Sequence, residues 1–133
     1  MRLYLPGAAY TSSQLESVYK HIDITVVPSA AGLTVIQSLQ FGRPVVTHSD
    51  VYNQMPEFEA IVPGVTGDLF TRGDAEGLAD VLERWVKRSS LERELIEDAC
   101  RAAVRERWSP QAHASRIMEQ LAPALLKKGG KAS

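Results

Sequence analysis

Four small residues, Ser29, Ala30, Ala31 and Gly32, separate an uncharged β-branched run from a helical pattern that begins at Leu33. A turn without bulky side chains lets a ligand reach the backbone N–H groups at the start of a helix, where negative charge is stabilised. The same residues would suit a tight strand-to-helix connection that binds nothing. Because ligands favour the carboxyl ends of parallel strands, both interpretations stay open.

A few polar side chains could take part in such binding. Gln37 and Gln40 lie one turn apart on an otherwise apolar helix, so one of them should meet a ligand or a backbone group. Glu57 and Glu59 fall at a possible helix start, where a carboxylate can cap N–H groups, and capping explains Glu59 better than Glu57. His48 precedes a polar stretch, and we expect it to be a surface histidine in a loop.

No other signature of catalysis or metal binding is present. The glycines fall in separate turns, so the sequence contains neither a dinucleotide-binding motif nor a P-loop, and zincin and nucleophile-elbow motifs are also missing. The three histidines belong to unrelated elements. We therefore expect no metal site.

The segment 24–48 must position the turn. Residues 24–27 predict a buried strand, a helix should run from Leu33 to a stop at Gly42, and a second buried strand should begin at Val45. Such a βαβ unit makes the two strands parallel neighbours joined by a right-handed crossover. The turn would then lie at the carboxyl end of the first strand.

The elements before and after this unit are shorter. We expect a strand over residues 2–5, a helix over 11–22, a short helical piece over 56–61 and a last strand over 68–70. The helix over 11–22 should start with a capping box. Its partners are either Thr11 with Gln14 or Ser13 with Glu16.

The rest of the chain is predicted to be helical. Asp74 should cap one helix, a second should begin near Ser90, and Ser109 followed by Pro110 should start a third. The expected apolar stripe of the second helix is Leu91, Leu95, Ala99 and Ala102.

Composition excludes several classes of protein. The 133 residues are 44% hydrophobic and 23% charged, which is typical of one globular domain. A net charge of −1 argues against a nucleic-acid-binding surface, and the single cysteine, Cys100, should be inert packing. The sequence has no membrane-span pattern and no signal-peptide pattern. We expect a cytoplasmic protein.

These elements predict the α/β class. Residues 1–72 should form a partial Rossmann-like domain with a mostly parallel sheet of about four strands. Residues 73–126 should form a helical C-terminal segment packed on it, and residues 127–133 a flexible basic tail. Since a parallel sheet normally has helices on both faces, a sheet that opens at residue 2 is expected to lack its opening units.

The run from Val26 to Val46, V-V-P-S-x-x-G-L-T-V-I-Q-S-L-Q-F-G-R-P-V-V, resembles the donor-site signature of GT-B glycosyltransferases of the retaining, nucleotide-sugar-dependent kind. The likeness is greatest to bacterial enzymes of surface-polysaccharide assembly, and it extends from about Leu3 to the final helix. The other matching positions are Gly7, Leu15 and Tyr19 and the segments 53–61 and 64–68.

The resemblance implies that this chain is the C-terminal, donor-binding part of such an enzyme. The donor would be a nucleotide-diphosphate sugar, with no cofactor. The turn would face the sugar and diphosphate, Gln37 the ribose, Ala8 and Ala9 the base, and the segment 54–57 the far side of the pocket. The implied donor-binding residues are Gly7, Ala8, Ala9, Ser29, Ala30, Ala31, Gly32, Leu33, Thr34, Gln37, Gln54, Met55 and Glu57.

The chain also departs from the family pattern. Many relatives carry two glutamates separated by seven residues, and Ser29 and Gln37 hold these places here. A glutamine can hydrogen-bond a ribose hydroxyl, but it has no charge to stabilise a developing cation. Such enzymes also have an N-terminal acceptor domain and early strands with basic groups for the diphosphate, and we expect neither in this chain.

Three functions are therefore considered. The first is the donor-side portion of a glycosyltransferase that acts on a glycan or lipid-linked acceptor and is inactive without the other half, in the cytoplasm or at the inner face of the membrane. The second is a non-catalytic remnant or partner-dependent subunit, paired with a chain that supplies the acceptor domain or with itself as a homodimer. A flavodoxin-like regulatory domain is disfavoured because no acidic cluster or phosphate loop is present.

Overall fold

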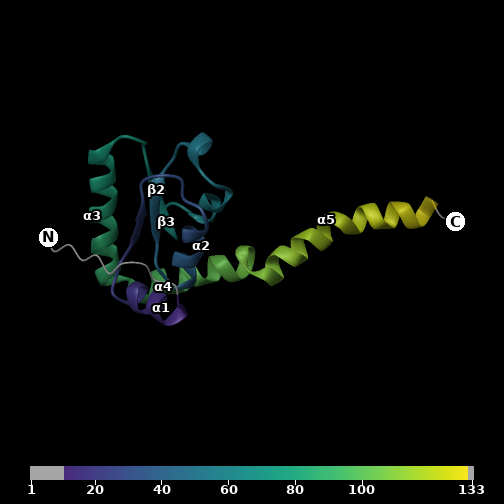
Figure 1. Cartoon of the computed structure of the whole chain (residues 1–133), viewed down its shortest axis with the longest axis horizontal. Helices are drawn as coiled ribbons and strands as arrows, with labels where there is room; N and C mark the ends of the chain where they lie inside the picture. The colour runs from purple at the N-terminus through teal and green to yellow at the C-terminus, as the bar shows by residue number, and fades with distance from the viewer. Residues whose placement is uncertain (1–10, 132–133) are drawn as a thin grey trace.

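A parallel three-stranded sheet lies at the centre of the fold (Figure 1). The computed structural model describes residues 11–131. Its strands are β1 (Thr25–Val27), β2 (Val45–His48) and β3 (Gly67–Phe70), in the order β1-β2-β3. The α/β class and the partial Rossmann-like architecture are confirmed. The strand expected over residues 2–5 lies outside the described residues.

The predicted βαβ unit is present. Helix α2 (Leu33–Gln40) follows β1 and leads into β2, and Val26 pairs with Val46 across the two strands. Gly42 ends the helix as expected, with a φ of +75° that side-chain-bearing residues rarely adopt. All four residues of β2, the central strand, are buried, which is the pattern of a strand covered on both faces of the sheet.

Short elements connect the strands. Helix α1 (Ser12–Lys20) starts with the capping box of Thr11 and Gln14, the first of the two alternatives. After β2 come two 3₁₀ turns, η1 (Val51–Asn53) and η2 (Pro56–Ala60), the second close to the short helical piece predicted there.

The remainder of the described chain is helical. It consists of α3 (Ala75–Leu91), α4 (Arg93–Ala103), the π-helical turn η3 (Val104–Trp108) and α5 (Pro110–Lys131). Asp74 caps α3 by accepting the Gly77 N–H at 3.0 Å. Figure 1 shows α5 extending away from the body of the fold, through residues where a tail was expected. None of the helices in residues 11–131 has the length and apolar character needed to cross a bilayer.

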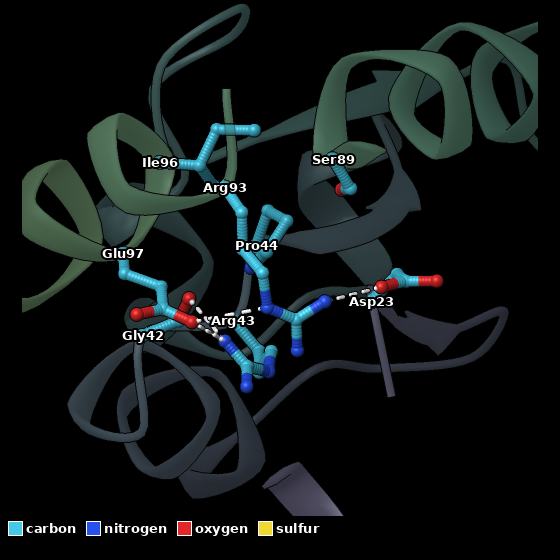
Figure 2. A pocket seen from close by; sticks show the side chains of 8 residues that line it. All are labelled: Asp23, Gly42, Arg43, Pro44, Ser89, Arg93, Ile96 and Glu97. Atoms are coloured by element: carbon cyan, nitrogen blue, oxygen red, sulfur yellow. Dashed lines mark hydrogen bonds and ion pairs between the residues drawn. The ribbon is translucent and has the colours of Figure 1, made fainter. Parts of the chain in front are cut away.

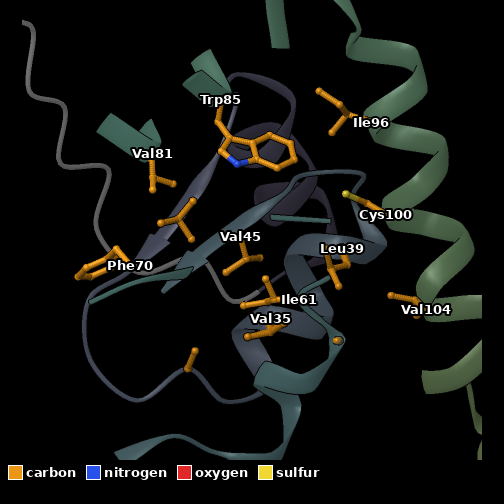
Figure 3. Close-up of a cluster of buried hydrophobic side chains, with 13 residues drawn as sticks. Val35, Leu39, Val45, Ile61, Phe70, Val81, Trp85, Ile96, Cys100 and Val104 are labelled. Atoms are coloured by element: carbon orange, nitrogen blue, oxygen red, sulfur yellow. The ribbon is translucent and has the colours of Figure 1, made fainter. Parts of the chain in front are cut away.

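A hydrophobic core joins the sheet to the helices that pack on it (Figure 3). Trp85 of α3 is 1% exposed, and the thiol of Cys100 on α4 is fully buried, which raises its pKa to about 12. Cys100 is therefore a packing residue, as expected. The labelled core side chains of Figure 3 are Val35, Leu39, Val45, Ile61, Phe70, Val81, Trp85, Ile96, Cys100 and Val104.

The expected apolar stripe of the second C-terminal helix was wrong. Leu91 is 85% exposed and Leu95 is 63% exposed, whereas Ile96, Cys100 and Val104 are buried. Residues four positions apart lie on one side of a helix, and this set faces α2. Two apolar stripes compete on this helix, and packing against α2 selects the one that contains the cysteine.

Candidate functional site

The turn between β1 and α2 has a buried side and an open side. Ala31 is fully buried, while Ser29 and Ala30 are exposed. Leu33 and Thr34, which start α2, are also exposed. As predicted from the βαβ pattern, the turn lies at the carboxyl end of β1.

The open side presents backbone donors. Gly32 is the N-cap of α2, and no side chain of the described residues caps the helix. The N–H groups of Gly32, Leu33 and Thr34 have no hydrogen-bond acceptor within residues 11–131. Three free N–H groups at the positive end of a helix can bind the oxygens of an anion.

Gln54 lies directly beside this turn. Its Oε1 accepts the Ala31 N–H at 2.8 Å, and its Nε2 donates to the His48 carbonyl oxygen at 2.8 Å and to the Thr47 hydroxyl oxygen at 2.9 Å. The Thr47 hydroxyl in turn donates to the Val27 carbonyl oxygen at 2.6 Å. The side chain of Gln54 thus joins the turn to the ends of β1 and β2.

Met55 packs against the same turn. A Cβ placed on Gly32 would lie 3.6 Å from the Met55 Cγ, an ordinary van der Waals contact. Gly32 has a φ of −101° and a ψ of −131°, so its backbone is not left-handed but lies outside the α and β regions. A side chain at this position would contact Met55 at the N-cap of α2.

Gln37 has a protein partner. Its Oε1 accepts a hydrogen bond from the Tyr19 hydroxyl at 3.2 Å, and the Tyr19 ring stacks on Phe41 with centroids 4.8 Å apart. Burial raises the pKa of Tyr19, so this phenol remains a proton donor. Gln40 is exposed, so of the two glutamines only Gln37 is held by the fold.

Glu57 presents a carboxylate oxygen that is buried without a hydrogen-bond partner among the described residues. It lies in η2, which packs against α2, whereas Glu59 of the same turn is exposed. The implied residues Gly7, Ala8 and Ala9 lie outside the described residues.

The expectation of a surface histidine at position 48 was wrong. His48 is 1% exposed and forms the last residue of the central strand β2. Its Nδ1 accepts the Asp50 N–H at 3.2 Å, which places the proton of the neutral ring on Nε2. The polar residues that follow suggested a loop, but the strand continues one residue further because β3 pairs with it there.

Sequence reasoning missed two groups at the carboxyl ends of the strands. One is the Thr47 hydroxyl, which a β-branched strand residue just before the loop could have suggested. The other is Arg72, which follows β3 and pairs with Asp50 at 3.1 Å. Hydrogen bonds from Asn53 and Arg72 lower the pKa of Asp50. A guanidinium therefore lies near the carboxyl ends of the strands.

A small cavity of about 10 Å³ lies at the amino ends of β1 and β2 (Figure 2). Arg43 and Arg93 both contact Glu97 there, and Arg93 also bonds Asp23 at 2.7 Å. The hydroxyl of Ser89 is buried without a partner among the described residues. Because its charges are paired within the chain, this cluster ties elements together.

Within the part of the chain that the structure describes, no group of three His, Cys, Asp or Glu side chains could hold a metal ion. The candidate site therefore consists of backbone donors, Gln37, Gln54, Met55 and Glu57.

Comparison with known proteins identifies the family. The family model described as "Glycosyl transferases group 1" matches residues 4–101, which include β1, α2, β2, β3 and most of α4. Searches of curated proteins and of solved structures returned no significant match. The matched region contains the open turn and all its described contacts. This chain therefore belongs to the glycosyl transferases group 1 family.

Proposed function

We propose that this chain is the donor-side portion of a glycosyltransferase and that it binds a nucleotide-diphosphate sugar at the turn between β1 and α2. The observation that carries the proposal is the set of free N–H groups at Gly32, Leu33 and Thr34, which follows a parallel strand in a member of this family. Diphosphate oxygens are strong acceptors for such donors. The sugar would pass to a glycan or lipid-linked acceptor.

The chain's own groups would act by orientation and by stabilising charge on the departing diphosphate. The Nε2 of Gln37 would donate to a ribose hydroxyl, while Tyr19 holds the Oε1 of the same amide. Met55 and Glu57 would line the far side of the pocket, and Ala8 and Ala9 would offer backbone to the base. We propose a retaining outcome and a role in surface-polysaccharide assembly, both on the resemblance alone.

Turnover would require an acceptor-binding domain, in the same protein or on a partner chain. We propose a location in the cytoplasm or at the inner face of the membrane. A second candidate is a non-catalytic subunit that binds the donor or another chain. It is favoured by Ser29 and Gln37, which stand where many relatives have glutamates.

Donor binding can be tested by ligand-detected NMR with UDP-glucose and GDP-mannose at millimolar concentration. We expect saturation transfer to the nucleotide with the wild-type chain and none with Gly32→Val, because a valine would cover the free N–H groups beside Met55. The control is Ala79→Val, at an exposed position of α3, which should bind as wild type does. Absence of binding by the folded wild-type chain would refute the proposal.

Turnover separates the two candidates. We expect no acceptor-dependent turnover by the isolated chain, and turnover once the acceptor domain or partner chain is added. Nucleotide-sugar binding that never leads to transfer in the completed assembly would favour the non-catalytic subunit. Robust turnover by the isolated chain would contradict the need for a second domain.

A further inference from the structure

The hydrogen-bonding groups of the Gln54 amide are directed at the protein. Both hydrogens of Nε2 are used, one by His48 and one by Thr47, and Oε1 accepts the Ala31 N–H. An amide nitrogen has only two hydrogens, so Gln54 has no donor left for a ligand. The resemblance to the family implied that Gln54 lines the donor pocket, but these contacts give it another task.

The donor and acceptor groups around position 54 require an amide side chain there, as glutamine has. The one hydroxyl hydrogen of Thr47 is directed at two carbonyl oxygens, that of Val27 at 2.6 Å and that of Ser29 at 3.3 Å, so Thr47 can only accept from Gln54. The His48 carbonyl also accepts, whereas the Ala31 N–H donates. One side chain must therefore donate twice and accept once at the same time, which an amide can do and an ionised carboxylate cannot.

This arrangement has two effects on the turn. It removes the Ala31 N–H from the donors open to a ligand, so that the free set begins at Gly32. It also fixes Ala31 relative to the end of β2, the central strand of the sheet. Thr47 also reaches the turn, at the Ser29 carbonyl oxygen, but among the described residues Gln54 alone accepts the Ala31 N–H.

We propose that Gln54 is a positioning residue, which holds the β1–α2 turn in its anion-binding geometry by acting through Ala31 and β2. The inference rests on the proposed donor-binding function of the turn. Gln54 touches the turn and the sheet, and the donor diphosphate touches the N–H groups of Gly32 to Thr34. Loss of the amide therefore releases the turn and weakens binding of the diphosphate.

The first measurement is independent of any ligand. In ¹H–¹⁵N spectra of the full chain, Gln54→Met should speed hydrogen exchange of the Ala31 amide by about tenfold or more, because methionine keeps the volume and removes the acceptor. The matched control is Gln40→Met on the exposed side of α2, which should leave Ala31 exchange unchanged. Unchanged Ala31 exchange in Gln54→Met would overturn the proposal.

The second measurement is the binding of UDP-glucose and GDP-mannose. Their diphosphates carry no terminal phosphate, so their charge stays constant between about pH 5 and pH 8. Gln54→Met should weaken binding by about tenfold, the equivalent of one net hydrogen bond. Equal affinity of this variant and the wild-type chain would overturn the proposal.

A glutamate at the same position supplies a pH test that a loosened fold would not mimic. In Gln54→Glu the ionised carboxylate opposes the His48 carbonyl, and protonation restores one donor. Relative to the wild-type chain at the same pH, binding by Gln54→Glu should therefore strengthen as the pH falls, while the ratios for Gln54→Met and Gln40→Glu stay level. His48, whose carbonyl oxygen accepts from Gln54, is present in every chain, so its own pH response cancels in this ratio. A level profile for Gln54→Glu would overturn the proposal.

The hydrogen-exchange and binding measurements together distinguish failure of the positioning role from failure of the proposed function. If the wild-type chain binds neither nucleotide sugar, the proposed function fails, and the donor-positioning role fails with it. The Ala31 exchange then still decides whether Gln54 fixes the turn structurally. If the wild-type chain binds and the Gln54 variants bind equally well, the donor site stands and the positioning role of Gln54 is refuted.

Discussion

Glu97 is the residue on which three arginines converge. Arg43 lies beside it and is 7% exposed in its side chain, Arg93 approaches at 3.4 Å and Arg101 at 3.9 Å. Partial burial acts to raise the pKa of the Glu97 carboxyl, but the hydrogen bond and charge of Arg43, with the charges of Arg101 and Arg93, outweigh it. The pKa of Glu97 is therefore lowered from its ordinary value of 4.5.

Glu97→Gln should change how stability depends on pH. A carboxyl whose pKa is lower in the folded chain adds stability above the unfolded pKa and loses it as the pH falls through the folded pKa. The wild-type chain should therefore lose more free energy of unfolding between neutral and acid pH than Glu97→Gln. At neutral pH the variant should be less stable by about 3 kcal/mol, since Arg43 keeps its buried charge without a carboxylate to balance it.

Urea denaturation at a series of pH values measures this effect. Glu94→Gln, on an exposed position of the same helix, provides the control and should follow the wild-type profile. Identical pH profiles for Glu97→Gln and the wild-type chain would show that the ion pairs do not stabilise the fold.

Single residues were predictable where local chemistry decides, and not where a distant partner does. The small residues of the turn and the glycine at position 42 follow from backbone sterics, and the sequence indicates both. The environment of His48 depends on β3, which lies about 20 residues further along the chain and pairs with it. The contacts of Gln54 likewise depend on Ala31 and Thr47, which no local pattern connects to it.

At the scale of elements, boundaries were easier to predict than faces. The end of α2 is marked by Gly42, the start of β2 by Pro44 and the start of α3 by the capping Asp74, and all three act locally. The buried face of α4 could not be found in this way, because helical periodicity fits two stripes. Contacts with α2 decide between them.

The corrected face of α4 predicts unequal effects of two neighbouring substitutions. Ile96→Ala should destabilise the chain by about 3 kcal/mol, because it removes buried methyl groups and leaves a cavity. Leu95→Ala should change stability by less than about 0.5 kcal/mol, because that side chain is mostly exposed. The midpoints of urea denaturation measure the two losses of stability. Equal losses for Ile96→Ala and Leu95→Ala would mean that the buried stripe of α4 is assigned wrongly.

The junction of β2 and β3 depends on a glycine. A Cβ on Gly67 would overlap the carbonyl oxygen of Val45, so Gly67→Ala must push the strands apart. Gly73 also has a positive φ, of +83°, but has open space around it. Gly73→Ala should cost about 1 kcal/mol for its conformation alone, and Gly67→Ala distinctly more.

Thermal melts of both alanine variants test this difference. The melting temperature should fall further for Gly67→Ala than for Gly73→Ala. If the order is reversed, the close approach of the two strands at Val45 is not what requires a glycine.

At the scale of the whole molecule, the α/β class and the family followed from the sequence, because several motifs occur in the right order. The division into residues 1–72 and 73–126 stays a prediction. The hydrophobic core draws on both segments, since Trp85, Ile96 and Cys100 complete the cluster formed by α2 and the sheet.

This shared core predicts cooperative unfolding. Near-ultraviolet and far-ultraviolet circular dichroism should report one coincident transition for the whole chain. A chain that ends at residue 73 should fail to fold, because it lacks α3 and α4. A chain that ends at residue 112 is the matched control and should fold, since α5 packs chiefly on η3. A folded 73-residue fragment would contradict the shared core.

The same shared core has a consequence for the synthesis of the protein on the ribosome. When β3 has been made, the apolar faces of β2 and α2 still lack the side chains of α3 and α4 that will cover them. At about 5–20 residues per second, Val104 follows Phe70 after roughly 2–7 s. During that interval we expect chaperones that hold unfolded chains to bind the nascent chain. Slow codons between positions 71 and 104 would prolong the exposure and lower the yield of folded protein.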